Sequence, residues 1–441
     1  MFRHDVLLYA PTMDPRTAHA LTRFGLGRNG AEPPPADPAA WLLDQLRQPD
    51  SLWPGPLPSA TEGLTAIRWD RENKPPPAES RARPLYQAEG TAAMARAVAT
   101  RTPFRERLVW FWSNHFTISL RRGVCAAVAG AFVQEAIRPF VTGRFEDMLL
   151  AVMRHPAMLL YLDNAMSIGP GSTAGRASQR GLNENLAREC LELHTVTPAS
   201  GYTQTDVTAF ARILTGWSLD LKADPPGFRF RPGVHEPGEH AVLGRVFPAG
   251  EAGGVAALHF LARHPAAHRH LAAKLTRHFT SDEPPPAAIR RIEGILRDTG
   301  GDLGAAAAGL VGLNEAWTPR TKFRAPLDLV VAGFRALDVP PDPPPAFLPI
   351  LGGLGQPLWT APAPDGWPDT APFWSGPEAM MRRIDWAFGF AQRIGGRDPM
   401  AIAESVLGTP HRQETADAMR RAGSRREALT LLLTSPEFQR R

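Results

Sequence analysis

The fold of this chain is decided by TPFRERLVWFWSNHFTI, which spans residues 102–118. A threonine followed by Pro103 is typical of a helix start, because proline suits the first helical position. At roughly 100° per residue, one broad face collects the large apolar side chains. These are Phe104, Leu108, Phe111, Trp112, Phe116 and Ile118. His115 lies near the middle of that face, so the segment predicts an amphipathic helix that buries a histidine.

The same helical spacing of apolar residues extends over about 88–217 and returns over 255–337. Two irregular stretches interrupt it. The first, about 218–254, has Gly, Pro and short mixed runs, which predict a long loop or a small hairpin. The second, about 339–377, is rich in Pro, Gly and Trp. We therefore predict an all-α, mainly helical fold in which residues 1–441 form a single intertwined domain with two irregular excursions.

Composition and charge narrow the classes of function. The 441 residues are 43% hydrophobic and 21% charged, which is sufficient for a large folded core. The net charge of +5 comes from scattered arginines rather than from a basic stripe, so we expect no nucleic-acid partner. No apolar run reaches the length of a membrane span. The first residues lack the build of a signal peptide, which predicts a cytoplasmic protein, or a periplasmic one exported with a partner.

Three polar residues project from apolar helical faces: His115, His194 at the end of 183–194, and Asp206. Asp206 also has a simpler interpretation, as the partner of Thr203 in a capping box. Burial without partners costs about 2 kcal/mol or more for each group, so we expect all three to be largely buried and paired. If they converge, they suit a two-histidine, one-carboxylate metal site, or a histidine base oriented by Asp206. Otherwise each is a hydrogen-bonded core residue.

The candidate site therefore has a catalytic and a binding set. The catalytic candidates are His115, His194, Asp206 and Glu192, and the binding candidates are Asn114, Glu189, Arg212 and His235. Glu189 and Glu192 belong to a polar arc around Arg188, for which a solvated face of ion pairs is the alternative. His235 lies in the Gly/Pro-bounded loop 231–240, which suits a lid, a metal loop or a polar surface loop. A divalent metal is the cofactor that such side chains would hold, but no particular cofactor follows.

For two further stretches, the sequence predicts whether the side chains lie at the surface or against the core. The histidines His264, His268, His270 and His278 lack the acidic partner of a zinc-protease motif, so we interpret them as surface residues. The segment 359–374 has too many tryptophans for an unattached loop. We expect it to pack near 201–217 as a cover over any pocket.

Short motifs spread over nearly the whole chain carry a family likeness. They include RFGLG at 23–27, FWSNHF at 111–116, HPAML at 155–159, YLDN at 161–164, NENLARECLELH at 183–194, GYTQTDV at 201–207, LTGW at 214–217, GGDL at 300–303 and SPEF at 435–438. With these motifs the chain resembles the bacterial family catalogued as domain of unknown function 1800. It departs from the family pattern at Ser113, where His is common, and at Cys190, where Leu is common. It also departs at Glu236 and His240, where Asp and Lys are usual, which weakens a role for the His235 loop.

The resemblance implies no settled activity. Members are often encoded beside a sulfatase-like protein of the family called domain of unknown function 1501, and many carry export signals. Two hypotheses follow. The chain is an enzyme with a buried His/Asp/Glu site, metal-assisted or not, that acts on a carbohydrate or on a phosphate or sulfate ester. Alternatively, it is a non-catalytic partner that folds with, chaperones or delivers the sulfatase-like protein.

Overall fold

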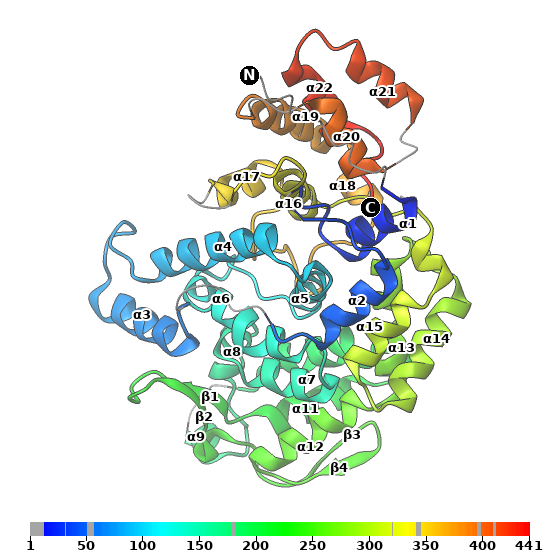
Figure 1. The fold of residues 1–441 in the computed structure, drawn as a ribbon. Coiled ribbons are helices and arrows are strands. Elements are labelled where there is room, and N and C mark those ends of the chain that lie inside the picture. Colours follow the sequence, from blue (N-terminus) through cyan, green and yellow to red (C-terminus); the bar gives the residue numbers. More distant parts are fainter. Residues whose placement is uncertain are drawn as a thin grey trace.

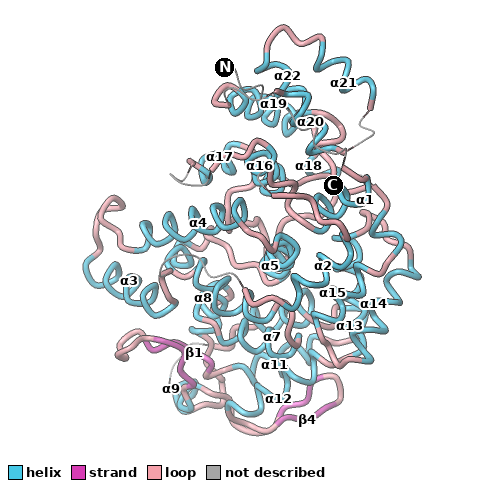
Figure 2. The backbone as a smooth tube through the Cα atoms, viewed as in Figure 1, coloured by secondary structure: helices cyan, strands magenta, loops and turns pink. Residues whose placement is uncertain are grey.

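The computed structural model describes residues 13–30, 32–50, 57–177, 181–319, 321–340, 345–394, 398–408 and 412–441. Within these ranges the chain is mainly helical, with two small two-stranded antiparallel sheets (Figures 1 and 2). The predicted fold class is therefore confirmed, whereas the single domain stays a prediction. Among the described residues, no helix is both long and apolar enough to cross a bilayer.

The helices follow one another with short connections. The first are α1 (Pro15–His19), α2 (Pro38–Arg47), α3 (Ala60–Asn73), α4 (Ala82–Ala99), α5 (Pro103–His115) and α6 (Ala129–Phe132). The middle ones are α7 (Phe145–Arg154), α8 (Pro156–Tyr161), α9 (Thr173–Ala177), α10 (Asn185–Glu189), α11 (Gln204–Leu214), α12 (Glu251–Ala262), α13 (Pro265–Phe279), α14 (Pro286–Asp298) and α15 (Leu303–Val311). The last are α16 (Pro326–Ala336), α17 (Phe347–Gly353), α18 (Ala371–Trp374), α19 (Pro377–Ala391), α20 (Pro399–Leu407), α21 (Gln413–Arg420) and α22 (Arg425–Thr434).

Several helices contain or adjoin tighter or wider turns. The π-turns are Ala20–Phe24, Val133–Ile137 and Cys190–His194, and the 3-10 turns are Gly123–Ala127, Arg138–Phe140, Asn164–Met166, Pro198–Ser200, Pro232–Val234 and Asn314–Trp317. The π-turn at Cys190–His194 follows α10 directly, so the segment 183–194 is not the single ideal helix that its periodicity predicts. Because a π-turn shifts the register of side chains, the angular positions expected there hold only approximately.

Both sheets lie in the first predicted excursion, where they confirm the expected hairpin. Strand β1 (Trp217–Asp220) pairs with β2 (Gly227–Phe230), and β3 (His240–Val242) pairs with β4 (Arg245–Phe247). The two residues between β3 and β4 are Leu243, with φ 48°, and Gly244, with φ 76°. Positive φ at both positions is the geometry of a tight hairpin turn. The second excursion is mostly irregular and includes the short helices α17 and α18; residues 341–344 lie outside the described part.

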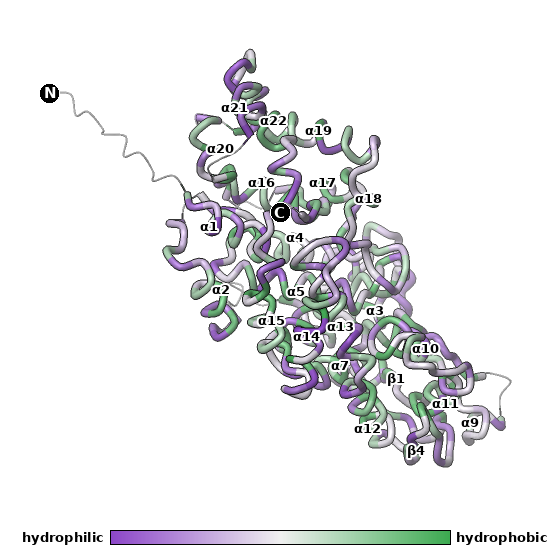
Figure 3. The backbone as a smooth tube through the Cα atoms, turned by 90° about the vertical axis from the view of Figure 1, so that its right-hand side faces the viewer, coloured by the Kyte–Doolittle hydropathy of each residue, from purple (hydrophilic) through white to green (hydrophobic). Residues whose placement is uncertain are grey.

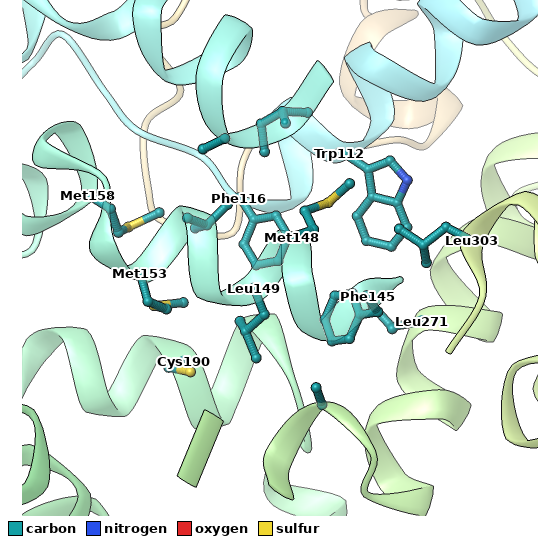
Figure 4. Close-up of a cluster of buried hydrophobic side chains, with 14 of the residues drawn as sticks. Trp112, Phe116, Phe145, Met148, Leu149, Met153, Met158, Cys190, Leu271 and Leu303 are labelled. Carbon is teal, nitrogen blue, oxygen red and sulfur yellow. The ribbon is translucent and has the colours of Figure 1, made fainter. Parts of the chain in front are cut away.

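Helix α5 confirms the helix predicted for 102–118 and crosses the middle of the molecule. Thr102 occupies the N-cap position, but its side chain makes no capping bond, and Gln45 of α2 accepts the Phe104 amide at 2.8 Å instead. Trp112 and Phe116 pack on Phe145 of α7, with ring centroids 5.8 Å and 6.1 Å away. Figure 4 shows these rings in the same buried cluster as Met148 and Leu149.

Buried apolar side chains form two large clusters. One is built mainly from α5, α7, α8 and α11–α15, and the other from α4, α16, α17, α19, α20 and α22. Two views at right angles place α16 and α17 between α4 and the α19–α22 group (Figures 1 and 3). Helix α5 contributes to the first cluster, while Trp110 on α5 packs against the second. The boundary between the clusters therefore runs along α5.

Candidate active site

A cavity of about 420 Å³ opens along this boundary. Its volume falls within the range of about 300–1,000 Å³ that small-molecule sites occupy. The walls come from α4, α5, α13, residues 323–328 and residues 356–374. The polar residues in its wall include His115, Lys274, Arg277, His278, Asp365 and Asp369. The aromatic residues in its wall are Trp110, Phe111, Phe323, Trp359, Trp367 and Trp374.

The tryptophan-rich segment 359–374, called the cover below, lies over this cavity and is hydrogen-bonded to α5. The Asn114 amide donates to the Trp367 carbonyl at 2.9 Å and accepts from the Trp367 amide at 2.8 Å. The Leu120 amide donates to the Trp359 carbonyl at 2.8 Å. The expected cover is therefore confirmed, but its expected place beside 201–217 is wrong. The reason is that Asn114 offers a donor and an acceptor to the same peptide unit, and no equivalent anchor on 201–217 holds the tryptophans.

Two polar residues of α13, Lys274 and His278, line the cavity. His270, one turn before Lys274, instead contacts the Leu193 carbonyl at 2.9 Å. Spacing by four residues places the three on one helical face. The interpretation of this histidine group as surface is wrong, since His268 is buried, His270 is half-buried and the His278 side chain is only 14% exposed. The repeat of basic residues every four positions was the available signal.

His278 is held by a carboxylate from the cover. Its Nδ1 lies 2.8 Å from Asp369 Oδ2, and because a carboxylate only accepts, Nδ1 carries the proton. Nε2 of His278 is then an open acceptor, buried and without a partner among the described residues. Burial lowers the pKa of His278 to about 4, although the Asp369 charge opposes that shift. The imidazole is consequently neutral near pH 7.

Asp369 stays ionised because cations surround it. Burial alone would raise the pKa of its carboxyl group, but the His278 ring, Lys322 and Arg441 together lower it well below the usual range. The Lys322 ammonium lies 3.4 Å from Asp369 Oδ1 and 2.6 Å from Asp282 Oδ1. The pair of His278 and Asp369 thus combines a neutral imidazole with a fixed carboxylate.

Lys274 lies one helical turn before His278 and lines the same cavity. No acceptor among the described residues is within hydrogen-bond distance of its ammonium group. Burial lowers the pKa of Lys274 to about 8, with the nearby Asp365 and Asp369 charges opposing. The side chain is therefore still mostly protonated at neutral pH but has no counterion in contact.

His115 and His194 are buried, as predicted. Their exposed fractions are 1% and 0%, and their rings lie 5.9 Å apart between centroids. His115 Nε2 donates to the His194 carbonyl at 3.2 Å, whereas His115 Nδ1 and both ring nitrogens of His194 have no partner in the described part of the chain. Burial lowers the pKa of His115 well below its usual range, and that of His194 to about 3. His115 lines the cavity, and His194 lies behind it.

Asp206 does not join these histidines, so the condition for a shared site is not met, and Asp206 is half-buried where a largely buried side chain was expected. Its side chain is half-buried and completes a capping box, accepting from the Thr203 amide at 2.7 Å. Its other oxygen accepts from the Leu243 amide at 2.7 Å. Because it accepts from these two amides, the carboxylate points toward the N-terminus of α11 and not into the core. Over the described ranges, no three His, Cys, Asp or Glu side chains are placed to share a metal ion.

The remaining candidates divide between the cavity and the scaffold. Glu189 and Glu192 are half-buried, and burial together with the Glu192 and Asp365 charges raises the pKa of Glu189. Neither residue lines the cavity. His235 is a scaffold residue, because Nδ1 donates to the Thr215 carbonyl at 2.7 Å and Nε2 accepts from the Gly250 amide at 2.7 Å. Arg212 and Glu192 are absent from the cavity wall, whereas Asn114 belongs to it.

Fold and site together define a mainly helical protein with a partly basic cavity under a tryptophan-rich cover. The chain belongs to the family described as protein of unknown function (DUF1800), which matches residues 19–440. This confirms the resemblance seen in the motifs. No curated protein and no solved structure matches the chain.

Proposed function

We propose that the chain is an enzyme that hydrolyses a phosphate or sulfate ester, such as an esterified carbohydrate, in the cavity between α5 and α13. The observation that carries this proposal is the pair of His278 and Asp369, in which Nδ1 donates at 2.8 Å and Nε2 remains open. This pair takes the catalytic role that the sequence assigned to His194, Asp206 and Glu192.

A neutral histidine with a fixed tautomer is suited to general base catalysis. The carboxylate of Asp369 holds the proton on Nδ1 and would stabilise the imidazolium that forms when Nε2 takes a proton. Because His278 lines the cavity, a water molecule bound there could transfer its proton to Nε2. Such a base would increase the rate by about 100-fold to 10,000-fold.

A small excess of positive charge in the cavity wall, five basic residues against four acidic ones, supports an anionic substrate. Glu106 is neutralised by Arg138 at 2.7 Å, and Asp328 by Arg107 at 3.0 Å. Lys274 is half-buried and has no ion pair in the described part of the chain, so its ammonium, partly removed from water, is stabilised when an anion binds. A phosphate or sulfate group would supply that anion.

The aromatic walls support a ring attached to the anion. Trp359, Trp367 and Trp374 come from the cover, and Trp110 lies on α5. Their faces offer large, rigid apolar surfaces on which a flat or sugar ring can stack. An apolar wall with a few placed polar groups is the usual composition of a small-molecule site.

The proposal is tested with 4-nitrophenyl phosphate and 4-nitrophenyl sulfate. We expect the wild type to hydrolyse one of them, and His278→Gln to reduce kcat/KM by about 100-fold or more. Glutamine can still donate to Asp369, so the scaffold is preserved. The matched control is His259→Gln on α12, outside this cavity, which should leave kcat/KM unchanged. No turnover by the wild type, or full turnover by His278→Gln, contradicts the proposal.

A second candidate function is that of a partner for the sulfatase-like protein. Large apolar side chains are exposed at seven described positions, and five of them belong to α18, α19 and α22. These five are Phe373, Met381, Ile384, Phe388 and Leu431. Met381, Ile384 and Phe388 lie three and four residues apart and therefore share one face of α19, and an exposed apolar face favours a protein partner. Mixing the two purified proteins in size-exclusion chromatography tests this: co-elution that Met381→Gln with Phe388→Gln abolishes supports the partner role.

A further inference from the structure

We propose that Lys274 is the proton donor to the leaving-group oxygen, in the reaction for which His278 is the base. This inference rests on the proposed function and deepens it, because it assigns the acid as well as the base. It also restricts the substrate class to esters whose alcohol must be protonated as it departs, such as sugar esters.

The geometry of α13 places the two groups on one wall. Residues four apart on a helix have Cβ atoms about 6 Å apart and lie on the same face, so Lys274 and His278 both meet the cavity. That separation allows an ester group to lie between an acid and a base. The Nε2 atom of His278 is buried and has no hydrogen-bond partner over the described part of the chain. Lys274 is half-buried, and no described acceptor contacts its ammonium group.

The use of lysine in this chain is the second observation. Only four of the 49 basic residues are lysines, at positions 74, 222, 274 and 322. Two of the four, Lys274 and Lys322, belong to this site. Arginine keeps its proton in proteins, while a buried lysine can release it near neutral pH. In a chain that otherwise uses arginine, an amine at position 274 indicates that the amine itself is needed.

The surroundings of each group push their pKa values apart. Around Lys274 are His115 on α5, His194, the α13 residues His270 and Arg277, and Asp365 and Asp369 from the cover. Around His278 are Asp369, Arg441 and Arg107. Burial brings the pKa of Lys274 to about 8 and that of His278 to about 4. Between these values the lysine is charged and the histidine neutral, which is the pattern of an acid and base pair.

The proposed step balances in atoms and charge. A water oxygen attacks the phosphorus or sulfur atom and forms the new bond, while its proton passes to His278 Nε2. The bond from phosphorus or sulfur to the alcohol oxygen breaks. That oxygen takes its proton from the Lys274 ammonium and leaves as the alcohol. The proton on His278 returns through solvent to Lys274, which restores both groups.

Leaving-group dependence tests this role. The probes are the 4-nitrophenyl ester that the wild type hydrolyses and the corresponding phenyl ester, whose alcohol is a poorer leaving group. We expect Lys274→Arg to slow the phenyl ester by about 100-fold or more, and the nitrophenyl ester by less than about 10-fold. The alkaline limb of the pH profile of kcat/KM should also disappear. Lys222→Arg, at an exposed position, is the matched control and should change neither ester.

Other outcomes separate the two proposals. Equal rates for Lys274→Arg and the wild type, or an equal loss on both esters, would mean that Lys274 only supplies charge and overturn the proton-donor role alone. A wild type inactive on both nitrophenyl esters overturns the proposed function and this role with it. Lys274→Met should lose activity on both esters, because the anion then has no cation. If Lys274→Met does not fold, the comparison of esters with Lys274→Arg still decides.

Discussion

His278 of α13 and Asp369 of the cover lie ninety-one residues apart in sequence and are joined by a 2.8 Å hydrogen bond. The bond orients the proposed base and attaches the tryptophan-rich segment to the helical body. The same carboxylate therefore serves the chemistry and the closure of the site. Its two roles can be separated by substitution, because only one of them depends on which ring nitrogen carries the proton.

Asp369→Asn should abolish most activity while leaving the fold intact. An amide in place of the carboxylate no longer forces the proton onto Nδ1, so Nε2 is not held as an acceptor. We expect kcat on the 4-nitrophenyl ester to fall by about 1,000-fold or more. The control is Asp385→Asn at an exposed position of α19, away from the cavity wall. A loss of less than about 10-fold in Asp369→Asn would mean that His278 needs no carboxylate partner.

Gly366→Ala should loosen the cover. A Cβ atom at Gly366 would lie 2.4 Å from the Asn114 carbonyl oxygen, and φ is +87°. Both the contact and the backbone geometry disfavour alanine, so we expect a loss of about 1–3 kcal/mol in unfolding free energy or detachment of the segment. Denaturant unfolding and quenching of tryptophan fluorescence measure the two outcomes. Gly376→Ala, where φ is −64° and no atom lies within 4 Å, should change neither.

Asp206→Ala should cost stability rather than catalysis. The carboxylate caps α11 and holds Leu243, so its removal is expected to reduce the free energy of unfolding by about 1 kcal/mol. Urea denaturation followed by circular dichroism gives this value. Because Asp206 is not part of the cavity wall, kcat/KM should stay within about 2-fold of the wild type, whereas a loss above about 100-fold would restore its catalytic role.

Glu89→Gln should stabilise the protein at alkaline pH. Glu89 of α4 is 3% exposed, and burial raises its pKa from 4.5 to about 8, with the Glu135 and Glu62 charges adding to the shift. The folded carboxyl thus holds a proton that the unfolded one releases above about pH 4.5, so this group makes stability fall as pH rises from about 4.5 to about 8. Glutamine mimics the neutral acid and should gain roughly 4 kcal/mol at pH 8.

The pH series supplies the control for that substitution. At pH 4 both proteins carry a neutral group at position 89, so their melting temperatures should coincide within error. A melting temperature of Glu89→Gln that is lower than the wild type at pH 8 would contradict the buried, protonated state. Glu62→Gln at the start of α3 should instead destabilise, because the capping box with Ser59 loses its carboxylate.

Periodicity sufficed for the helices and for two of the buried histidines. The apolar stripe of 102–118 places His115 inward, and the structure has it 1% exposed. Angular position alone does not say whether an inward polar group reaches a cavity, a core or a capping box. Asp206 shows this limit, because its helical angle points inward while its bonds to Thr203 and Leu243 turn the carboxylate aside.

The pairing of His278 with Asp369 could not be predicted from the sequence. Asp369 lies in an irregular segment without periodicity, and only tertiary packing brings it to His278. The surface interpretation of the α13 histidines assumed that polar residues on a helix meet solvent outside. Here His278 lines a cavity and His268 is buried, so that assumption fails. The four-residue spacing of His270, Lys274 and His278 was visible, but its meaning depended on what faces the helix.

The fastening of the cover limits the shape of what can reach the site. Its contacts recur along its length, from the Leu120 amide on Trp359, through Asn114 on Trp367, to Asp282 on the Ala371 amide. Such a segment cannot swing aside at a single hinge, because several bonds would break together. A substrate then enters the cavity through an opening that does not widen. A long polymer could insert its end into that opening but not its middle. For the proposed hydrolysis, an ester group at the end of such a polymer would then be preferred over one in its middle.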